Sequence, residues 1–308
     1  ITIGLGSSTS ELETVRVLAA GRVTAFALEL VPRISRSQSM DALSSQALVS
    51  GYRAVLEAAI RFQRFFPLYM TAAGTIPPAK VLVLGAGVAG LQAIGTAKRL
   101  GARVSANDIR PSSAEEVASI GGTFISLDLD TAPEAAQAVG GYARELSEDR
   151  GERQRQLLAP HVAASDVLIT TAAIPGRAAP LLVTTEMVAG MRAGSVVIDL
   201  AAESGGNVEG VIAGEDVLVP VADGYVTLVG LTDAASSVAT DASRLYAKNV
   251  ANLLALMTSN GTVAPDFADE IVSATCLTHN GEVRHAPTAA LLAPIAVQAH
   301  DRSAHEED

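Results

Sequence analysis

The sequence has little that would cross-link it, span a membrane or attract a polyanion. One cysteine, Cys276, among 308 residues excludes an internal disulfide and fits a reducing compartment, and its thiol is most simply a small core side chain. No apolar run reaches the roughly 18 residues that a transmembrane helix needs. The net charge is −11, from 22 Lys and Arg against 33 Asp and Glu. Nucleic acids and anionic membranes are therefore poor partners for the bulk surface.

Several kinds of catalytic motif are also missing. The five histidines stand singly, and no spacing of Cys, His or carboxylates is that of a metal site. There is no Ser-centred nucleophile elbow and no phosphate-binding G-x-x-x-x-G-K-[ST] motif. We therefore predict no metal ligand, and we expect that an oxidoreductase with this sequence would hold a cofactor that carries the chemistry.

A complete dinucleotide-binding fingerprint runs from Lys80 to Asp108. A short apolar run leads directly into the turn GAGVAG, and an amphipathic stretch and a second apolar run follow. Gly85 permits the tight turn, Gly87 lets the backbone approach a pyrophosphate, and Gly90 lets the helix pack on the strand. The helix N-terminus offers N–H groups and a positive dipole end to the phosphates. We expect a dinucleotide here rather than a glycine-rich turn without a ligand, with strands over 81–84 and 103–106 and a helix over 91–100.

The acidic residue after the second strand indicates which dinucleotide binds. Asp108 lies where a carboxylate accepts hydrogen bonds from an adenosine ribose. The same carboxylate repels a 2′-phosphate, so NAD(H) is favoured over NADP(H). Arg110 lies two residues further on and could contact a 2′-phosphate, which keeps NADP(H) open as a minor alternative.

The rest of the chain alternates strands with helices, which is typical of an α/β fold. Hydrophobic residues make up 49% of the sequence and are mostly Ala and Val, as suits a buried parallel sheet. We expect a Rossmann-type doubly wound parallel sheet in an NAD-binding domain over 43–257 with flanking inter-domain helices. A second, incomplete α/β domain would come from 1–42 and 258–299, and 300–308 would be a disordered acidic tail. The few N-terminal elements cannot bury a core alone, so we expect about a hundred further residues before this sequence.

The remaining elements are predicted from periodicity and turn residues. Helices are expected over 12–20, 43–66, 111–120, 146–158, 184–191 and 241–257, with a linker over 69–78. Strands are expected over 1–5, 22–30, 123–126, 166–171, 195–200, 218–221 and 226–229, with further strands within 262–283.

A polar loop, PRISRSQSMD, separates two apolar segments between Pro32 and Asp41. One interpretation is a solvated loop that caps the following helix through Ser39 or Asp41. The other is a loop that orients a polar ligand. The residues by themselves favour the first interpretation.

Two further segments are candidate parts of a ligand site. Gly140 and Gly141 precede Tyr142 and indicate either a mobile loop or a simple turn. Residues 170–176 follow a predicted strand, and ligands of open parallel sheets lie at such carboxyl ends.

Five stretches together resemble the NAD(H)-binding component, domain I, of proton-translocating NAD(P) transhydrogenase. They are PRISRSQSMDALSS, VLVLGAGVAGLQAIGTAKRLGA, GGYARE, ITTAAIPGRAAP and GSVVIDLAAESGGN. The similarity runs from about residue 23 to residue 257, and weakly to residue 285. Alanine dehydrogenase shares the fold and several motifs, whereas PRISRSQSMD and GGYARE resemble transhydrogenase specifically.

The resemblance implies an enzyme subunit that binds NAD(H) and passes a hydride to NADP(H) held on a partner domain. A membrane-spanning partner would couple this transfer to proton movement, in contrast to the Si-specific transhydrogenases. It also implies a homodimer located in the cytoplasm, held at the inner membrane through its partner subunits.

The resemblance also assigns roles to residues. Gln38, Arg33 and Asp41 would be the catalytic residues, in a loop near the nicotinamide, and Gly141 with Tyr142 would belong to a loop that closes over the nucleotide. With the fingerprint glycines included, the predicted cofactor contacts are Arg33, Ile34, Ser35, Gln38, Ser39, Met40, Asp41, Gly85, Gly87, Val88, Gly90, Asp108, Ile109, Arg110, Gly141, Tyr142, Gln154 and Ala173.

Two alternatives stay open beside the transhydrogenase interpretation. One is an alanine-dehydrogenase-like enzyme that reduces pyruvate with ammonia. The Lys and His of that enzyme would lie in the segment expected before this sequence, so their absence cannot exclude it. The other is an NAD-binding scaffold that is not catalytic.

Overall fold

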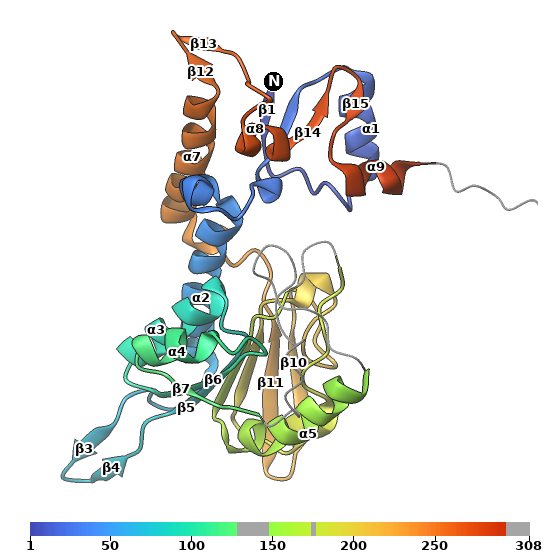
Figure 1. Cartoon of the computed structure of the whole chain (residues 1–308). Coiled ribbons are helices and arrows are strands. Elements are labelled where there is room, and N and C mark those ends of the chain that lie inside the picture. The colour runs from blue at the N-terminus through green and yellow to red at the C-terminus, as the bar shows by residue number, and fades with distance from the viewer. Residues whose placement is uncertain (128–147, 174–176, 294–308) are drawn as a thin grey trace, which may run out of the picture. The chain divides into compact units, whose positions relative to one another are not determined.

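The computed structural model describes residues 1–127, 148–173 and 177–293, and its chain divides into two units (Figure 1). The larger unit is Arg33–Leu256, and the smaller unit consists of the described residues before and after it. Within the described part of the chain, no helix has both the length and the apolar character needed to cross a membrane.

The larger unit is built on a seven-stranded sheet in the order β10-β11-β9-β8-β5-β6-β7. All neighbouring strands are parallel except the hairpin of β10 and β11. This confirms the predicted α/β class and Rossmann-type sheet. The strands are β5 Lys80–Leu84, β6 Arg103–Asn107, β7 Thr123–Phe124, β8 Val167–Thr170, β9 Val196–Asp199, β10 Asp216–Val221 and β11 Gly224–Gly230.

Helices cover both faces of this sheet. The helices on the sheet are α2 Ala42–Arg61, α3 Val88–Arg99, α4 Ser113–Ser119, α5 Glu148–Ala164 and α6 Thr185–Ala189. Helix α7 Ala239–Leu256 packs on α2, and the unit also has short 3-10 turns, η2 Ser35–Met40, η3 Ala202–Ser204 and η4 Ser236–Val238. Alternate residues of β5 enter two separate cores, because successive side chains of a strand point to opposite faces. Val81 and Val83 pack with α2 and α3, whereas Leu82 and Leu84 pack with α5 and α6. Burial on both faces explains why this strand is a continuous apolar run.

Helices α2 and α3 approach each other through a glycine. A Cβ on Gly51 of α2 would lie 2.0 Å from the carbonyl oxygen of Ala89, in the first turn of α3. No side chain fits there, so glycine at this position allows the two backbones to touch. The start of α3 is thereby fixed against α2.

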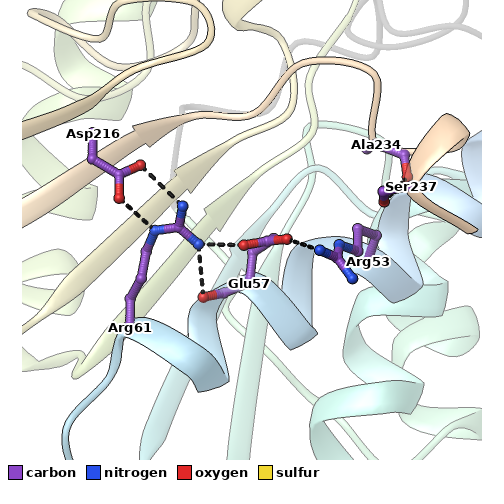
Figure 2. Close-up of polar contacts among 6 residues, drawn as sticks. All are labelled: Arg53, Glu57, Arg61, Asp216, Ala234 and Ser237. Atoms are coloured by element: carbon purple, nitrogen blue, oxygen red, sulfur yellow. Dashed lines mark hydrogen bonds and ion pairs between the residues drawn. The ribbon is translucent and has the colours of Figure 1, made fainter.

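A row of four charges ties the C-terminal half of α2 to the sheet edge (Figure 2). The buried carboxylate of Glu57 pairs with Arg53 and with Arg61, each one helical turn away. Arg61 also forms a fork with Asp216 at the start of β10, with its Nε and Nη2 atoms 2.7 and 3.1 Å from the carboxylate oxygens. The hydrogen bond to Asp216 raises the pKa of Arg61 above its usual value.

The smaller unit has a four-stranded sheet in the order β1-β2-β14-β15. Its elements are β1 Thr2–Gly4, α1 Leu12–Ala20, β2 Ala25–Ala27, η1 Leu28–Leu30, β12 Thr258–Ser259, β13 Thr262–Val263, α8 Glu270–Thr275, β14 Cys276–His279, β15 Glu282–Val283 and α9 Ala286–Leu292. Val15, Ala27 and Leu277 form a small core in this unit. Cys276 is buried, as expected for a core thiol, and burial raises its pKa.

Several predicted elements differ from the structure. The strand expected over 22–30 is the short β2 followed by η1, and the predicted linker over 69–78 holds the hairpin of β3 Tyr69–Thr71 and β4 Gly74–Ile76. Helix α2 ends at Arg61 rather than at residue 66. Phe62 is already extended, and its ring packs edge-on against that of Phe66, with centroids 5.9 Å apart. Pro67 follows Phe66, and a residue before proline is disfavoured in a helix.

Candidate functional site

The glycine-rich turn between β5 and α3 has room for a ligand at one of its three glycines. A Cβ on Gly85, whose φ is +95°, would lie 2.6 Å from Thr171 Oγ1, and a Cβ on Gly90 would lie 1.9 Å from the carbonyl oxygen of Gly85. These two glycines are therefore required by the fold. A Cβ on Gly87 would meet no atom within 4 Å. The free space at Gly87 is what a pyrophosphate approaching the backbone needs.

The start of α3 adds hydrogen-bond donors to this space. Gly87 is the N-cap, and the helix begins at the exposed Val88, three residues earlier than predicted. The first-turn N–H groups of an α-helix have no acceptor within the helix, and they lie at the positive end of its dipole. The turn therefore fits the pyrophosphate of a dinucleotide in both shape and charge.

The carboxylate of Asp108 lies one residue beyond β6 and is committed to the chain on both oxygens. Its Oδ2 accepts from the N–H of Ala86 at 2.7 Å, and its Oδ1 accepts from the N–H of Arg110 at 2.8 Å. The guanidinium of Arg110 bridges both oxygens, with Nε and Nη2 each 3.0 Å away. This pairing raises the pKa of Arg110. A ribose at Asp108 would therefore share the carboxylate with Arg110, and the Arg110 charge is already balanced by its neighbour.

The polar loop after Pro32 forms η2 and leads into α2. Asp41 caps α2, because its Oδ1 accepts from the N–H of Ser44 at 2.9 Å and its Oδ2 accepts from the Ser44 hydroxyl at 2.6 Å. The predicted capping role of Asp41 is thus confirmed. Within this loop, the side chains of Ser37 and Met40 are buried.

The other predicted contacts in this loop differ in exposure. Arg33, Ser35, Gln38 and Ser39 are exposed, and Ile34 and Asp41 are half-buried. The buried Met40 presents little surface to a ligand. The loop therefore offers Arg33, Ser35, Gln38 and Ser39 at its surface.

A buried network organises the ends of β8 and β9. Asp199 is fully buried, and it accepts from the N–H groups of Ala201 at 2.8 Å, Asn207 at 2.6 Å and Val208 at 3.0 Å. Burial raises the pKa of this carboxyl, against the effect of those hydrogen bonds. The Asn207 side chain pairs with both the N–H and the C=O of Ala172, at 3.0 and 2.9 Å. Sequence reasoning missed both residues, although an acid at the end of a buried apolar strand was a signal for Asp199.

The strand order brings several of the predicted residues to one edge of the sheet. Strands β8, β5 and β6 are parallel neighbours, so the exposed Ala173, the glycine turn and the segment Asp108–Arg110 all follow adjacent carboxyl ends. Half-buried Ile109 lies within that last segment. Gln154 is buried in α5. Gly141 and Tyr142 lie outside the described residues, as do residues 174–176 of the candidate wall.

Comparison with known proteins identifies similar chains. The family described as "Alanine dehydrogenase/PNT, C-terminal domain" matches residues 54–286. An NAD(P) transhydrogenase alpha subunit of Rhodospirillum rubrum is 49% identical over 283 residues, which cover 91% of this chain and 72% of that protein. The crystal structure of transhydrogenase from Sinorhizobium meliloti is 46% identical with a TM-score of 0.78, covering 91% of this chain and 74% of the other. A solved L-alanine dehydrogenase has a TM-score of 0.73 over 94% of this chain and 74% of the other, and its 21% identity makes that a likeness of fold.

Proposed function

The chain belongs to the alanine dehydrogenase/PNT family, and we propose that it is the NAD(H)-binding component of a proton-translocating NAD(P) transhydrogenase. The similarity to transhydrogenases from Rhodospirillum rubrum and Sinorhizobium meliloti supports this role. In it, a hydride passes from NADH bound by this chain to NADP+ on a partner component. A membrane partner couples the transfer to proton movement and holds this component, as a homodimer, at the cytoplasmic face of the membrane.

The observation that carries the proposal is the free space beside Gly87. At the neighbouring Gly85 and Gly90, by contrast, a Cβ would collide with atoms of the protein itself. The pyrophosphate of NAD(H) would lie there, on the first-turn N–H groups of α3. Val88 begins that turn and would face the ligand from its exposed position. The protein's net charge of −11 disfavours an anionic ligand, so the local dipole supplies the attraction.

Asp108 would select NAD(H) over NADP(H). Its carboxylate is held in place by the Ala86 N–H and by Arg110, so it is pre-oriented to accept from ribose hydroxyls. A 2′-phosphate would meet a carboxylate at this point. Because the Arg110 guanidinium is paired with Asp108, it would offset the charge of a 2′-phosphate less than an unpaired arginine would.

The exposed loop around Gln38 would position the nicotinamide. Bound NADH supplies the hydride, and transfer between two nicotinamides leaves the proton count unchanged, so the chain needs no general base. Its residues would hold the ring aligned at near-attack distance. The neutral amide of Gln38 offers a donor and an acceptor without adding charge beside a ring that becomes positive. Asp41 would act mainly through the start of α2, since both its oxygens bind Ser44.

The test is Gln38→Asn, measured in the complete transhydrogenase assembly. Shortening the side chain should leave the NADH dissociation constant within about tenfold of the parent, while single-turnover hydride transfer falls about a hundredfold, as a misplacement of about 1 Å can cause. Stopped-flow absorbance with an NAD analogue whose reduced form absorbs at a distinct wavelength separates the two steps. Transfer at the parent rate from a weakened complex would make Gln38 a binding residue only. NADH binding by the parent without any transfer would favour the scaffold alternative.

A further inference from the structure

A buried amide on α7 holds the loop that carries Gln38. Asn249 is 6% exposed, and its Nδ2 donates to the carbonyl oxygen of Ser39 at 2.9 Å. Its Oδ1 accepts from the hydroxyl of Ser45, in the first turn of α2, at 2.7 Å. One side chain therefore links three elements of the larger unit: α7, the start of α2, and η2.

The carbonyl oxygen of Ser39 accepts hydrogen bonds from two side chains of α7. Asn252, one turn along α7 from Asn249, also donates to it at 2.9 Å. Two amides thus fill both lone pairs of one oxygen. Ser39 directly follows Gln38, and both residues are exposed between the buried Ser37 and Met40. The two amides therefore hold the exposed part of the loop at a point that burial does not reach.

We propose that Asn249 is a positioning residue for hydride transfer, acting on Gln38 through the Ser39 carbonyl. This inference rests on the role proposed above for Gln38. A buried amide has few tolerated orientations, because each of its ends must keep a partner. Asn249 therefore transmits the rigid position of α7 to the loop, where a shift of about 1 Å changes the transfer rate about a hundredfold.

The substitution Asn249→Leu removes the link while leaving no buried polar group without a partner. The Ser39 carbonyl keeps Asn252, and the Ser45 hydroxyl keeps the carbonyl of Ala42 at 3.1 Å. Leucine has the same branched outline as asparagine, although it is larger. The variant is expected to bind NADH within about threefold of the parent and to transfer hydride at least about tenfold more slowly, a fraction of the loss that a full misplacement causes.

The matched control is Gln46→Leu. Gln46 lies one residue after Ser45, and its Nε2 donates to the carbonyl oxygen of Ala242 at 3.1 Å and to the hydroxyl of Ser45 at 3.2 Å. It therefore ties the same two helices and reaches the same serine, while the bonds of Asn249 and Asn252 to the Ser39 carbonyl stay in place. This variant should lose stability to a similar extent by thermal denaturation and keep the parent transfer rate. Equal slowing in both variants would show that helix packing alone sets the rate, and would overturn the proposal.

A double-mutant cycle with Gln38→Asn tests the route of the effect. If Asn249 acts through Gln38, the double variant should be no slower than Gln38→Asn alone, whereas independent effects would multiply. Multiplying effects, or parent-rate transfer by Asn249→Leu, overturn the inference while Gln38→Asn still slows transfer. Parent-rate transfer by Gln38→Asn itself refutes instead the positioning role proposed for Gln38, on which this inference rests. Asn249→Ser, which is too short to span both partners, repeats the test if the leucine variant melts below the assay temperature.

Discussion

Gly87→Ala should weaken NADH binding without harming the fold. The residue has φ −72° and ψ −168°, which alanine adopts without strain, and its Cβ would meet no atom within 4 Å. Alanine is a poorer N-cap than glycine by several tenths of a kcal/mol. It also reduces the entropy of the unfolded chain, which stabilises by about 0.4–1 kcal/mol. These effects nearly cancel, so the melting temperature should stay within about 3 °C of the parent.

The loss in binding follows from the space that the new methyl group takes. A pyrophosphate pushed off the first turn of α3 loses about one charge-assisted hydrogen bond, worth about 1.5–3 kcal/mol. The dissociation constant for NADH should therefore rise about 10- to 150-fold. Isothermal titration calorimetry measures this directly, beside a thermal melt of the same preparation.

Gly95→Ala is the matched control for this experiment. Gly95 lies in the same helix, and its Cβ would meet only the tip of the Arg99 side chain, at 3.2 Å. The control should bind NADH as the parent does and melt at a higher temperature, because alanine favours a helix interior by about 1 kcal/mol. Parent-like NADH affinity in Gly87→Ala would refute a pyrophosphate at this turn.

Three further predictions follow from other parts of the structure. Gly51→Ala should destabilise the protein by about 1–3 kcal/mol, seen as a melting temperature roughly 3–10 °C lower, since its Cβ would overlap the Ala89 carbonyl. Asp108→Ala should weaken NADH binding by about 1–3 kcal/mol and narrow the preference over NADPH in calorimetry, and equal affinity of the parent for both would contradict the ribose assignment. Burial lowers the pKa of His285, so below about pH 6.5 the unfolded chain takes up a proton that the folded chain resists, and stability falls. Melts at about pH 7.5 and about pH 5.5 should show a larger loss for the parent than for His285→Asn.

The features of the site that were predictable from sequence are those fixed by local sterics. Gly85 and Gly90 are spaced as they are because one strand, one turn and one helix must pack together, and the structure blocks a Cβ at both. The cap at Asp41 was also predictable, because it is a local hydrogen bond to Ser44, three residues away.

The features that were not predictable depend on contacts between distant residues. The amide of Asn207 meets Ala172 across 35 positions, and that of Asn249 meets Ser39 across 210. No local pattern marks either asparagine, because its role exists only once the strands and helices are in place. The short hairpin of β3 and β4 escaped prediction because three-residue strands are too short to show a periodicity.

The row of charges along α2 has an evolutionary consequence. The net charge of the row is zero, since it holds two arginines, Arg53 and Arg61, and two acids, Glu57 and Asp216. Both arginines share the carboxylate of Glu57. Losing Glu57 alone would leave Arg53 and Arg61, two turns apart on one helix face, with Asp216 to pair with Arg61 but not with Arg53. In related sequences, a change of charge at position 57 should therefore occur together with a compensating change at one of its partners. The four positions should vary as a group that keeps a net charge of zero.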